Sequence, residues 1–151
     1  MISSYLIFLL SDRLFGVKLL GAIEILPWRK ARHVPLSYSY VEGLVDYRRT
    51  VYPVFNLGQR LGLNRQASIG FTPEESDQAE KKQSIILLEE NKFSFGIIVD
   101  SIVKMTKLEE PAAGPPQSKA QGIDLKYAKG FVYEEDQEIM ILDFERLLHA
   151  G

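Results

Sequence analysis

The sequence predicts a mainly β protein that consists of two small barrels packed side by side and related by an internal duplication. Short apolar runs rich in Ile, Val, Leu and Phe alternate with polar turns at close intervals, which is typical of β-barrels. A repeat within the chain divides its 151 residues into two similar halves. Such a length suits one domain with its own core.

The repeat is clearest between two segments at a constant offset of 87 residues. Residues 40–61 align with residues 127–148, with tyrosine at the first position, glycine at the fourth and leucine at the last in both. Upstream, Phe-Gly-Val at residues 15–17 aligns with Phe-Gly-Ile at residues 95–97, at an offset of 80. The two offsets differ because the second copy carries extra residues, which fall in a loop rich in Pro and Gly at residues 109–122. Two copies of this length indicate a duplication and not a solenoid.

Each copy is expected to contain strands followed by a short helix. Arg48 and Arg49 form the charged apex of a hairpin, while Asn56 and Asp143 each stand before a helix as its N-cap. The apolar spacing predicts strands at residues 5–10, 15–19, 44–47, 51–55, 84–88, 131–133 and 139–142, and helices at residues 57–61 and 144–148.

The domain organisation follows from the two copies. We expect a single domain over residues 1–151, with a first subdomain over residues 1–63 and a second over residues 84–151. The residues between them, 64–83, include Gly, Pro, Ser, Asp and Glu but few apolar side chains. This composition predicts a mobile connection.

Charge is distributed unevenly along the chain. Residues 1–63 hold 8 basic and 4 acidic side chains, and residues 64–151 hold 10 and 16, so the halves carry +4 and −6 within a net charge of −2. One interpretation is chance variation between two solvated surfaces. The other is a molecule with a basic end and an acidic end, which favours weak head-to-tail association.

The composition favours a soluble cytoplasmic protein. No cysteine is present, which fits a reducing compartment and excludes disulfides and cysteine-based metal sites. Residues 5–10 are apolar, but no basic region precedes them and charges follow at once, so a buried strand is favoured over a signal peptide. No apolar run approaches the roughly 20 residues that span a bilayer, so we expect no membrane insertion.

No set of residues predicts catalysis. The two histidines, His33 and His149, are far apart in the sequence and lack neighbouring ligand-type residues. Phosphate-binding glycine loops and nucleophile or zinc motifs are missing as well. The acidic run at residues 134–138 is typical of a solvated turn. We therefore expect a protein that is not an enzyme and has no cofactor, metal site or catalytic residue.

A nucleic-acid-binding barrel is the alternative function. The basic run at residues 28–33, together with Arg48, Arg49 and nearby tyrosines, resembles the basic and aromatic groove with which small barrels hold single strands. The isoelectric point of about 5.7 argues against it, because such modules usually carry a net basic footprint.

Four segments in order resemble the CheW-like family. YLIFLLSDRLFGVKLLGAIEIL, from Tyr5, resembles the opening strands of the family and its V-x-E-I segment, and EGLVDYRRTVYPVFNL, from Glu42, resembles KGVINLRGTIVPVIDL. FGIIVDSIVKM, from Phe95, and YAKGFVYEEDQEIMILDFERLL, from Tyr127, resemble the two later motifs. The resemblance covers nearly the whole chain.

The resemblance implies two side-by-side five-stranded SH3-like barrels with short helices. It also implies a non-catalytic scaffold that binds the cytoplasmic helical tip of a chemoreceptor and the regulatory domain of a histidine kinase, in receptor arrays at the inner membrane face. End-to-end barrel contacts with that kinase domain agree with the uneven charge. By position, Glu24 matches the glutamate of V-x-E-I, and Arg48 matches the arginine of N-L-R-G. The candidate partner-binding residues are Glu24, Ile25, Trp28, Arg48 and Arg49.

Several residues depart from the family pattern. Asp46 stands where the family has asparagine, Arg49 where it has glycine, Asn56 where it has aspartate, and Gly58 where it has arginine. Because glycine eases a turn with positive φ, we expect the hairpin at Arg49 to be shaped differently. The departures leave the identity of the receptor, the kinase and the output open.

Overall fold

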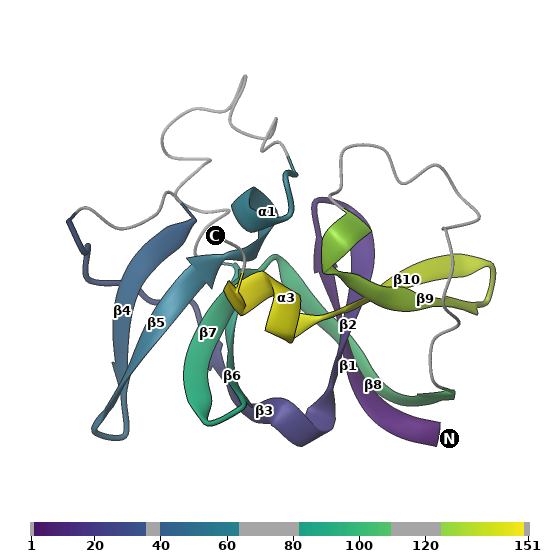
Figure 1. The fold of residues 1–151 in the computed structure, drawn as a ribbon, viewed down its shortest axis with the longest axis horizontal. Helices are drawn as coiled ribbons and strands as arrows, with labels where there is room; N and C mark the ends of the chain where they lie inside the picture. Colours follow the sequence, from purple (N-terminus) through teal and green to yellow (C-terminus); the bar gives the residue numbers. More distant parts are fainter. Residues whose placement is uncertain (1, 36–39, 64–81, 110–124, 150–151) are drawn as a thin grey trace.

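The computed structural model describes residues 2–35, 40–63, 82–109 and 125–149 (Figure 1). The connection predicted to be mobile, residues 64–83, lies outside the described residues except for Lys82 and Gln83.

In the described residues, ten strands form two five-stranded sheets, which confirms the mainly β fold class. The first sheet has the order β8-β1-β2-β10-β9, with β1 (Ile2–Leu10), β2 (Arg13–Lys18), β8 (Ser101–Glu109), β9 (Ala128–Glu134) and β10 (Gln137–Leu142). The second has the order β3-β6-β7-β5-β4, with β3 (Ala22–Pro27), β4 (Val41–Tyr47), β5 (Thr50–Asn56), β6 (Ser84–Glu90) and β7 (Phe93–Val99). The same part of the chain also contains the short helices η1 (Leu19–Gly21), α1 (Leu57–Arg60), η3 (Leu125–Tyr127) and α3 (Phe144–His149).

The two sheets are the same structure built twice. Position by position, β8-β1-β2-β10-β9 corresponds to β3-β6-β7-β5-β4. The central parallel pair makes the correspondence explicit, because Gly16 pairs with Ile141 in one sheet and Gly96 pairs with Val54 in the other. These partners are related by the offsets of 80 and 87 residues. The predicted duplication is therefore present in the fold.

The expected subdomain boundaries, 1–63 and 84–151, do not match the two sheets. The hairpin β1–β2 pairs with β8 and β10. In the other sheet β3 pairs with β6 and β5 pairs with β7, so each sheet takes strands from both copies. Residues 19–21 cause this exchange because they carry the chain from the first sheet into the second. The two copies have the same apolar pattern, and that pattern cannot distinguish pairing within a copy from pairing between copies.

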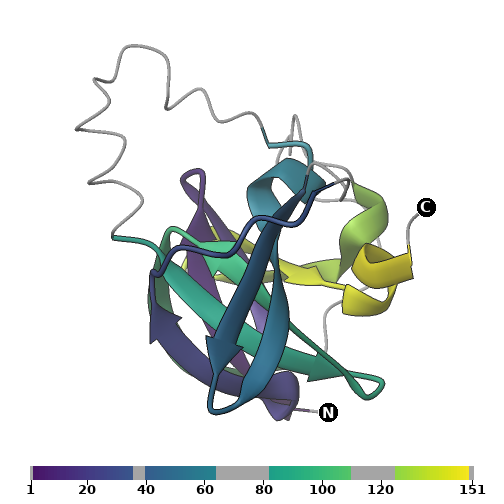
Figure 2. The ribbon, with the colours of Figure 1, turned by 90° about the vertical axis from the view of Figure 1, so that its left-hand side faces the viewer.

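The largest core lies between the barrels. Outward-facing side chains of β1 and β2 pack there against those of β6 and β7, and include Phe8, Phe15, Leu88 and Phe95. Two smaller clusters fill the barrels themselves, one around Tyr52 and Ile85 and one around Tyr5 and Ile139. Turning the molecule shows the strands of the second sheet in front (Figure 2). Because the barrels share one core, they form a single folding unit.

The hairpin between β4 and β5 keeps positive φ at both turn residues. Arg48 has a φ of 47° and Arg49 a φ of 65°. The other two-residue turns, at residues 11–12, 91–92 and 135–136, have the same signs of φ and also lack glycine. Arginine in place of glycine therefore does not prevent positive φ at both residues of this turn. The right-handed twist of the strands favours such turns, and Arg49 tolerates the strain.

The N-cap prediction is confirmed at Asn56. Its side-chain Oδ1 accepts a hydrogen bond from the N–H of Gln59 at 3.1 Å, while its Nδ2 donates to the Glu42 Oε1 at 3.0 Å. Asn56 is buried. An aspartate here would lose the donor and face a carboxylate, which explains the departure from the family pattern.

Replacing Asn56 with aspartate is therefore expected to lower the free energy of unfolding by about 2 kcal/mol at neutral pH. The second copy carries Lys129 and Asp143 at the positions of Glu42 and Asn56. Adding Glu42→Lys should thus recover most of the loss in urea denaturation. Equal stability of the single and double variants at neutral pH would contradict this account.

Candidate partner-binding site

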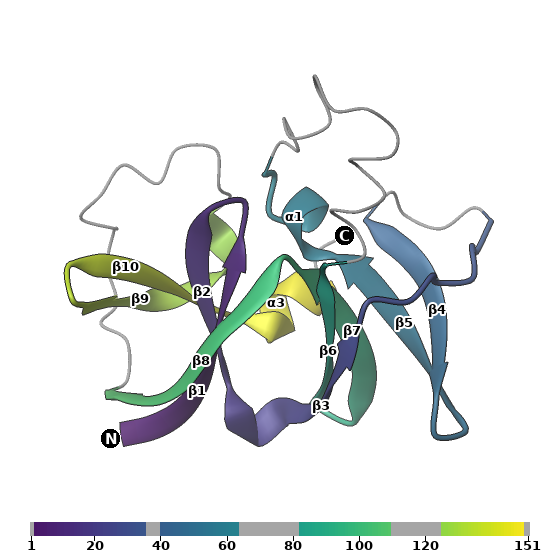
Figure 3. The same cartoon turned by 180° about the vertical axis from the view of Figure 1, so that it is seen from behind.

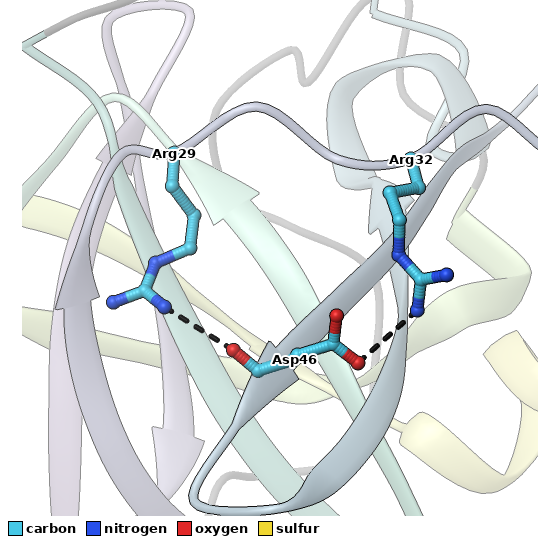
Figure 4. A network of polar contacts seen from close by, with 3 residues as sticks. All are labelled: Arg29, Arg32 and Asp46. Carbon is cyan, nitrogen blue, oxygen red and sulfur yellow. Dashed lines mark hydrogen bonds and ion pairs between the residues drawn. The ribbon is translucent and has the colours of Figure 1, made fainter.

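The second barrel is closed by the segment that follows β3. Arg32 exchanges backbone hydrogen bonds with Leu44 of β4, with N···O distances of 2.8 and 2.9 Å. Asp46 holds the same segment, because the Arg32 Nη2 donates to its carboxylate at 3.1 Å and the Arg29 Nη1 donates to its backbone carbonyl at 3.2 Å (Figure 4). The departure at Asp46 thus anchors part of the basic run. Both side chains of the Arg32–Asp46 pair are 61% exposed, so its contribution to stability is small.

Glu24 and Arg48 are joined through Tyr47. Glu24 lies on β3, and its Oε2 accepts a hydrogen bond from the Tyr47 hydroxyl at 3.1 Å. The guanidinium carbon of Arg48 lies 5.3 Å from the centroid of the Tyr47 ring, which is cation–π geometry. An anionic and a cationic candidate therefore both contact one tyrosine side chain, Glu24 at its hydroxyl and Arg48 over its ring. The sequence alone did not predict that Tyr47 contacts both candidates, although Tyr47 directly precedes Arg48 in the chain.

The other candidates lie in different surroundings. Arg49 is exposed at the hairpin tip beside Arg48. Trp28 is half-buried, and its backbone N–H donates to the carbonyl of Gln83 at 3.1 Å. Ile25 is half-buried and packs against the core between the barrels, so part of its side chain serves the fold. The structure groups Glu24 and Arg48, and gives no direct link from them to Trp28.

The corresponding end of the first barrel has the opposite charge. An ion pair between Lys104 of β8 and Glu134 of β9 stands where the second barrel has Glu24 and Tyr47. The hydrogen bond to the Glu134 carboxylate raises the pKa of the Lys104 amine above its ordinary value. Glu135 and Asp136 occupy the turn positions of Arg48 and Arg49. The basic and acidic hairpin tips lie at opposite sides of the molecule (Figure 1).

An apolar stripe on β8 was also missed by sequence reasoning. Val103 is 47% exposed and Met105 is 62% exposed. They correspond, at the offset of 80, to Ile23 and Ile25 of β3. The internal alignment could therefore have identified them as candidates, because Ile25 was already one. Seen from behind, β3 and β8 lie on the same face of the molecule (Figure 3). Exposed apolar side chains in a stripe are typical of an interaction surface.

Arg60 of α1 contacts residues of both copies of the repeat. Its guanidinium carbon lies 4.3 Å from the ring centroid of Tyr40 and 5.0 Å from that of Tyr127. Its Nε and Nη2 both donate to the carbonyl of Leu147 in α3, at 3.3 and 3.1 Å. One side chain thus satisfies a carbonyl near the end of α3 and stacks between the first tyrosines of the two repeats.

Removal of this side chain is expected to loosen the junction between the barrels. Arg60→Ala should lower the free energy of unfolding by about 2 kcal/mol, because it removes charge-assisted hydrogen bonds and two cation–π contacts. Arg60→Lys should recover less than half of that loss, since an ammonium lacks the planar fork. Guanidinium denaturation measures both. Full recovery by lysine would mean that charge alone matters.

The described residues contain no group of three His, Cys, Asp or Glu side chains placed to hold a metal ion. In the same part of the chain, no helix is long and apolar enough to cross a membrane.

Comparisons with known proteins agree with this arrangement. A family model, described as the CheW-like domain, matches residues 4–151. The chemotaxis protein CheW of Treponema pallidum is 29% identical over 143 residues, covering 95% of this chain and 80% of that protein. Chemotaxis protein CheV3 of Helicobacter pylori is 24% identical over 139 residues, covering 91% of this chain and 42% of that protein.

The fold has a counterpart among solved structures. The scaffolding protein TtCheW from Thermoanaerobacter tengcongensis gives a TM-score of 0.79 at 22% identity, covering 100% of this chain and 90% of that one. Two barrels with exposed charged tips and an apolar stripe define a domain built for protein–protein contacts. The chain belongs to the CheW-like domain family.

Proposed function

We propose that this chain is a non-catalytic scaffold that couples chemoreceptors to a histidine kinase in a chemosensory array. The family match over residues 4–151 carries the proposal and favours it over the nucleic-acid-binding alternative. The surfaces support it, because the exposed side chains at the barrel ends and on β8 suit docking. In this proposal the protein works in the cytoplasm, at receptor arrays on the inner face of the membrane.

The kinase contact uses the hairpin tip. Arg48 and Arg49 project from the end of the second barrel, where an acidic surface of the regulatory domain of the kinase would meet them. A weak head-to-tail contact between copies of the chain would use the same complementarity of charge.

The receptor contact uses the face that carries β3 and β8. A helical receptor tip presents apolar side chains on one stripe, and Ile25, Val103 and Met105 offer a matching surface. Glu24 supplies a carboxylate beside it, and Trp28, half-buried after β3, a further aromatic contact.

Co-sedimentation with receptor-containing membranes and the kinase tests this function. The protein should pellet only with receptor present, and recruit the kinase with it. Because the hairpin contact is electrostatic, kinase recruitment should fall between low and high salt, whereas the apolar receptor contact should change less. A protein that stays in the supernatant with its own receptor and kinase at low salt would refute the proposal.

A further inference from the structure

The sulfur atoms of this chain lie in contrasting surroundings. The sequence contains no cysteine and three methionines, of which Met1 lies outside the described residues. Met140 of β10 is 3% exposed and belongs to the core between the barrels, whereas Met105 of β8 is 62% exposed. A thioether must be reached by an oxidant before it can be oxidised. Among the residues that the structure describes, Met105 is therefore the sulfur open to an oxidant in solution.

Met105 lies at the exposed edge of the core between the barrels. The ladder pairs it with Leu6 of β1, which is fully buried in that core. Side chains of paired residues lie on the same face of a sheet, so Met105 is on the face that packs against the second barrel. Its strand is the first in the order β8-β1-β2-β10-β9, which leaves the side chain exposed beside β3 (Figure 3). A chemical change at Met105 thus alters a surface and leaves the core intact.

The equivalent position of the first copy carries no sulfur. At the offset of 80, Met105 corresponds to Ile25 of β3. A strand of this kind therefore accepts an aliphatic side chain at this position, and its packing does not require a thioether. Relative to isoleucine, methionine adds a flexible side chain whose sulfur can be oxidised reversibly.

We propose that Met105 is a reversible oxidation site that controls receptor docking, an inference that rests on the proposed receptor contact of β8. The oxidant is a peroxide. Its O–O bond breaks and an S–O bond forms, so that the thioether becomes a sulfoxide and hydrogen peroxide becomes water. A methionine sulfoxide reductase reverses the step with a dithiol, which becomes a disulfide while the oxygen leaves as water.

The sulfoxide opposes docking because it places a polar oxygen in an apolar contact. Val103, the exposed neighbour on the same face of β8, offers no donor from its side chain, and the amine of Lys104 is held by the carboxylate of Glu134. A hydrogen-bond acceptor that loses water without gaining a donor destabilises the contact. The affinity for receptor should fall about tenfold, which corresponds to about 1.4 kcal/mol. Kinase binding through Arg48 of the other barrel should change less.

Treatment of the full chain with hydrogen peroxide tests the proposal, with peptide mass spectrometry to locate the added oxygen. Met105 should gain an oxygen before Met140 does, because Met140 is buried. After removal of the peroxide, co-sedimentation with receptor-containing membranes should be weaker, and the reductase should restore it. Receptor that is already bound should slow the oxidation of Met105. An unchanged melting temperature should show that the oxidised protein is folded.

The variants Met105→Leu and Met105→Gln separate the sulfur from other targets of peroxide. For each protein the readout is the ratio of its receptor affinities before and after peroxide, so the starting affinities need not be equal. Met105→Leu has a similar volume without sulfur and should give a ratio near one. Met105→Gln is polar from the start, so it should bind weakly and be insensitive to peroxide.

Two results would overturn the proposal. One is a loss of affinity in Met105→Leu equal to that in the unmutated protein, which would assign the loss to another residue. The other is full receptor affinity in protein that is completely oxidised at Met105. Absence of receptor binding before any peroxide is added would instead refute the scaffold function, and this inference with it.

Discussion

Gly43→Ala is expected to lower the free energy of unfolding by about 4 kcal/mol. Gly43 has a φ of 147°, and a Cβ there would lie 2.1 Å from the carbonyl oxygen of Arg32. That carbonyl accepts the hydrogen bond from Leu44 that closes the second barrel. The clash is with backbone, so no side chain can move aside to relieve it.

Urea denaturation of Gly43→Ala and of Gly62→Ala measures this effect against a matched position. Gly62 also has positive φ, at 78°, but is exposed after α1. Alanine at Gly62 should cost about 1 kcal/mol, for backbone strain alone. Equal losses in the two variants would show that the approach of Arg32 to Gly43 does not hold the barrel closed.

Arg48→Glu is expected to abolish coupling while leaving the protein folded. Arg48 is exposed and has one weak contact, with the ring of Tyr47, so the change in stability should stay within about 0.5 kcal/mol. At an interface, the reversed charge would face its former partner as a like charge, at a cost of ~2–5 kcal/mol of binding. We therefore expect an unchanged melting temperature and loss of kinase binding.

Lys92→Glu provides the control for this charge reversal. Lys92 is exposed at another hairpin turn and shares the positive φ of Arg48. It should melt normally and retain full kinase binding. If Arg48→Glu binds the kinase as well as Lys92→Glu does, Arg48 does not belong to the site.

Local pattern determines the strands but not their partners. The alternation of apolar residues and the offset of 87 are enough to predict the hairpins, both helices and the N-caps, and all of them are present in the fold. The first hairpin, β1–β2, could pair with strands of its own copy or with the equivalent strands of the second copy, and in the structure it pairs with the second copy. Pairing within a copy and pairing between copies bury the same side chains, so the sequence leaves both open.

The sequence is enough to propose candidate residues for the site, but not the contacts between them. Position in the sequence marks Glu24 and Arg48 as candidates, but it does not reveal the hydrogen bond from Tyr47 to Glu24, which joins β4 to β3 across the barrel. The basic run at residues 28–33 indicates, by itself, a free charged surface. Its Arg32 is instead paired with Asp46, a contact between residues 14 apart that no local pattern encodes.

The departures from the family pattern become interpretable through packing. Gly58 has a neighbour that the sequence does not suggest, because Leu10 lies within van der Waals contact of the place where its Cβ would be. Asn56 avoids a second carboxylate beside Glu42. In both cases the residue that departs from the family pattern contacts a residue distant in the sequence, and the sequence alone does not show which residues are in contact.

Receptor-dependent activation of the kinase in a reconstituted mixture is the most direct test of the central claim. Receptor-containing membranes, the kinase and this protein from the same source are combined, and phosphorylation of the kinase is followed with each component omitted in turn. The account predicts strong activation only when all three are present. Activation that is equal with and without this protein, at concentrations where it co-sediments with both partners, would contradict the account.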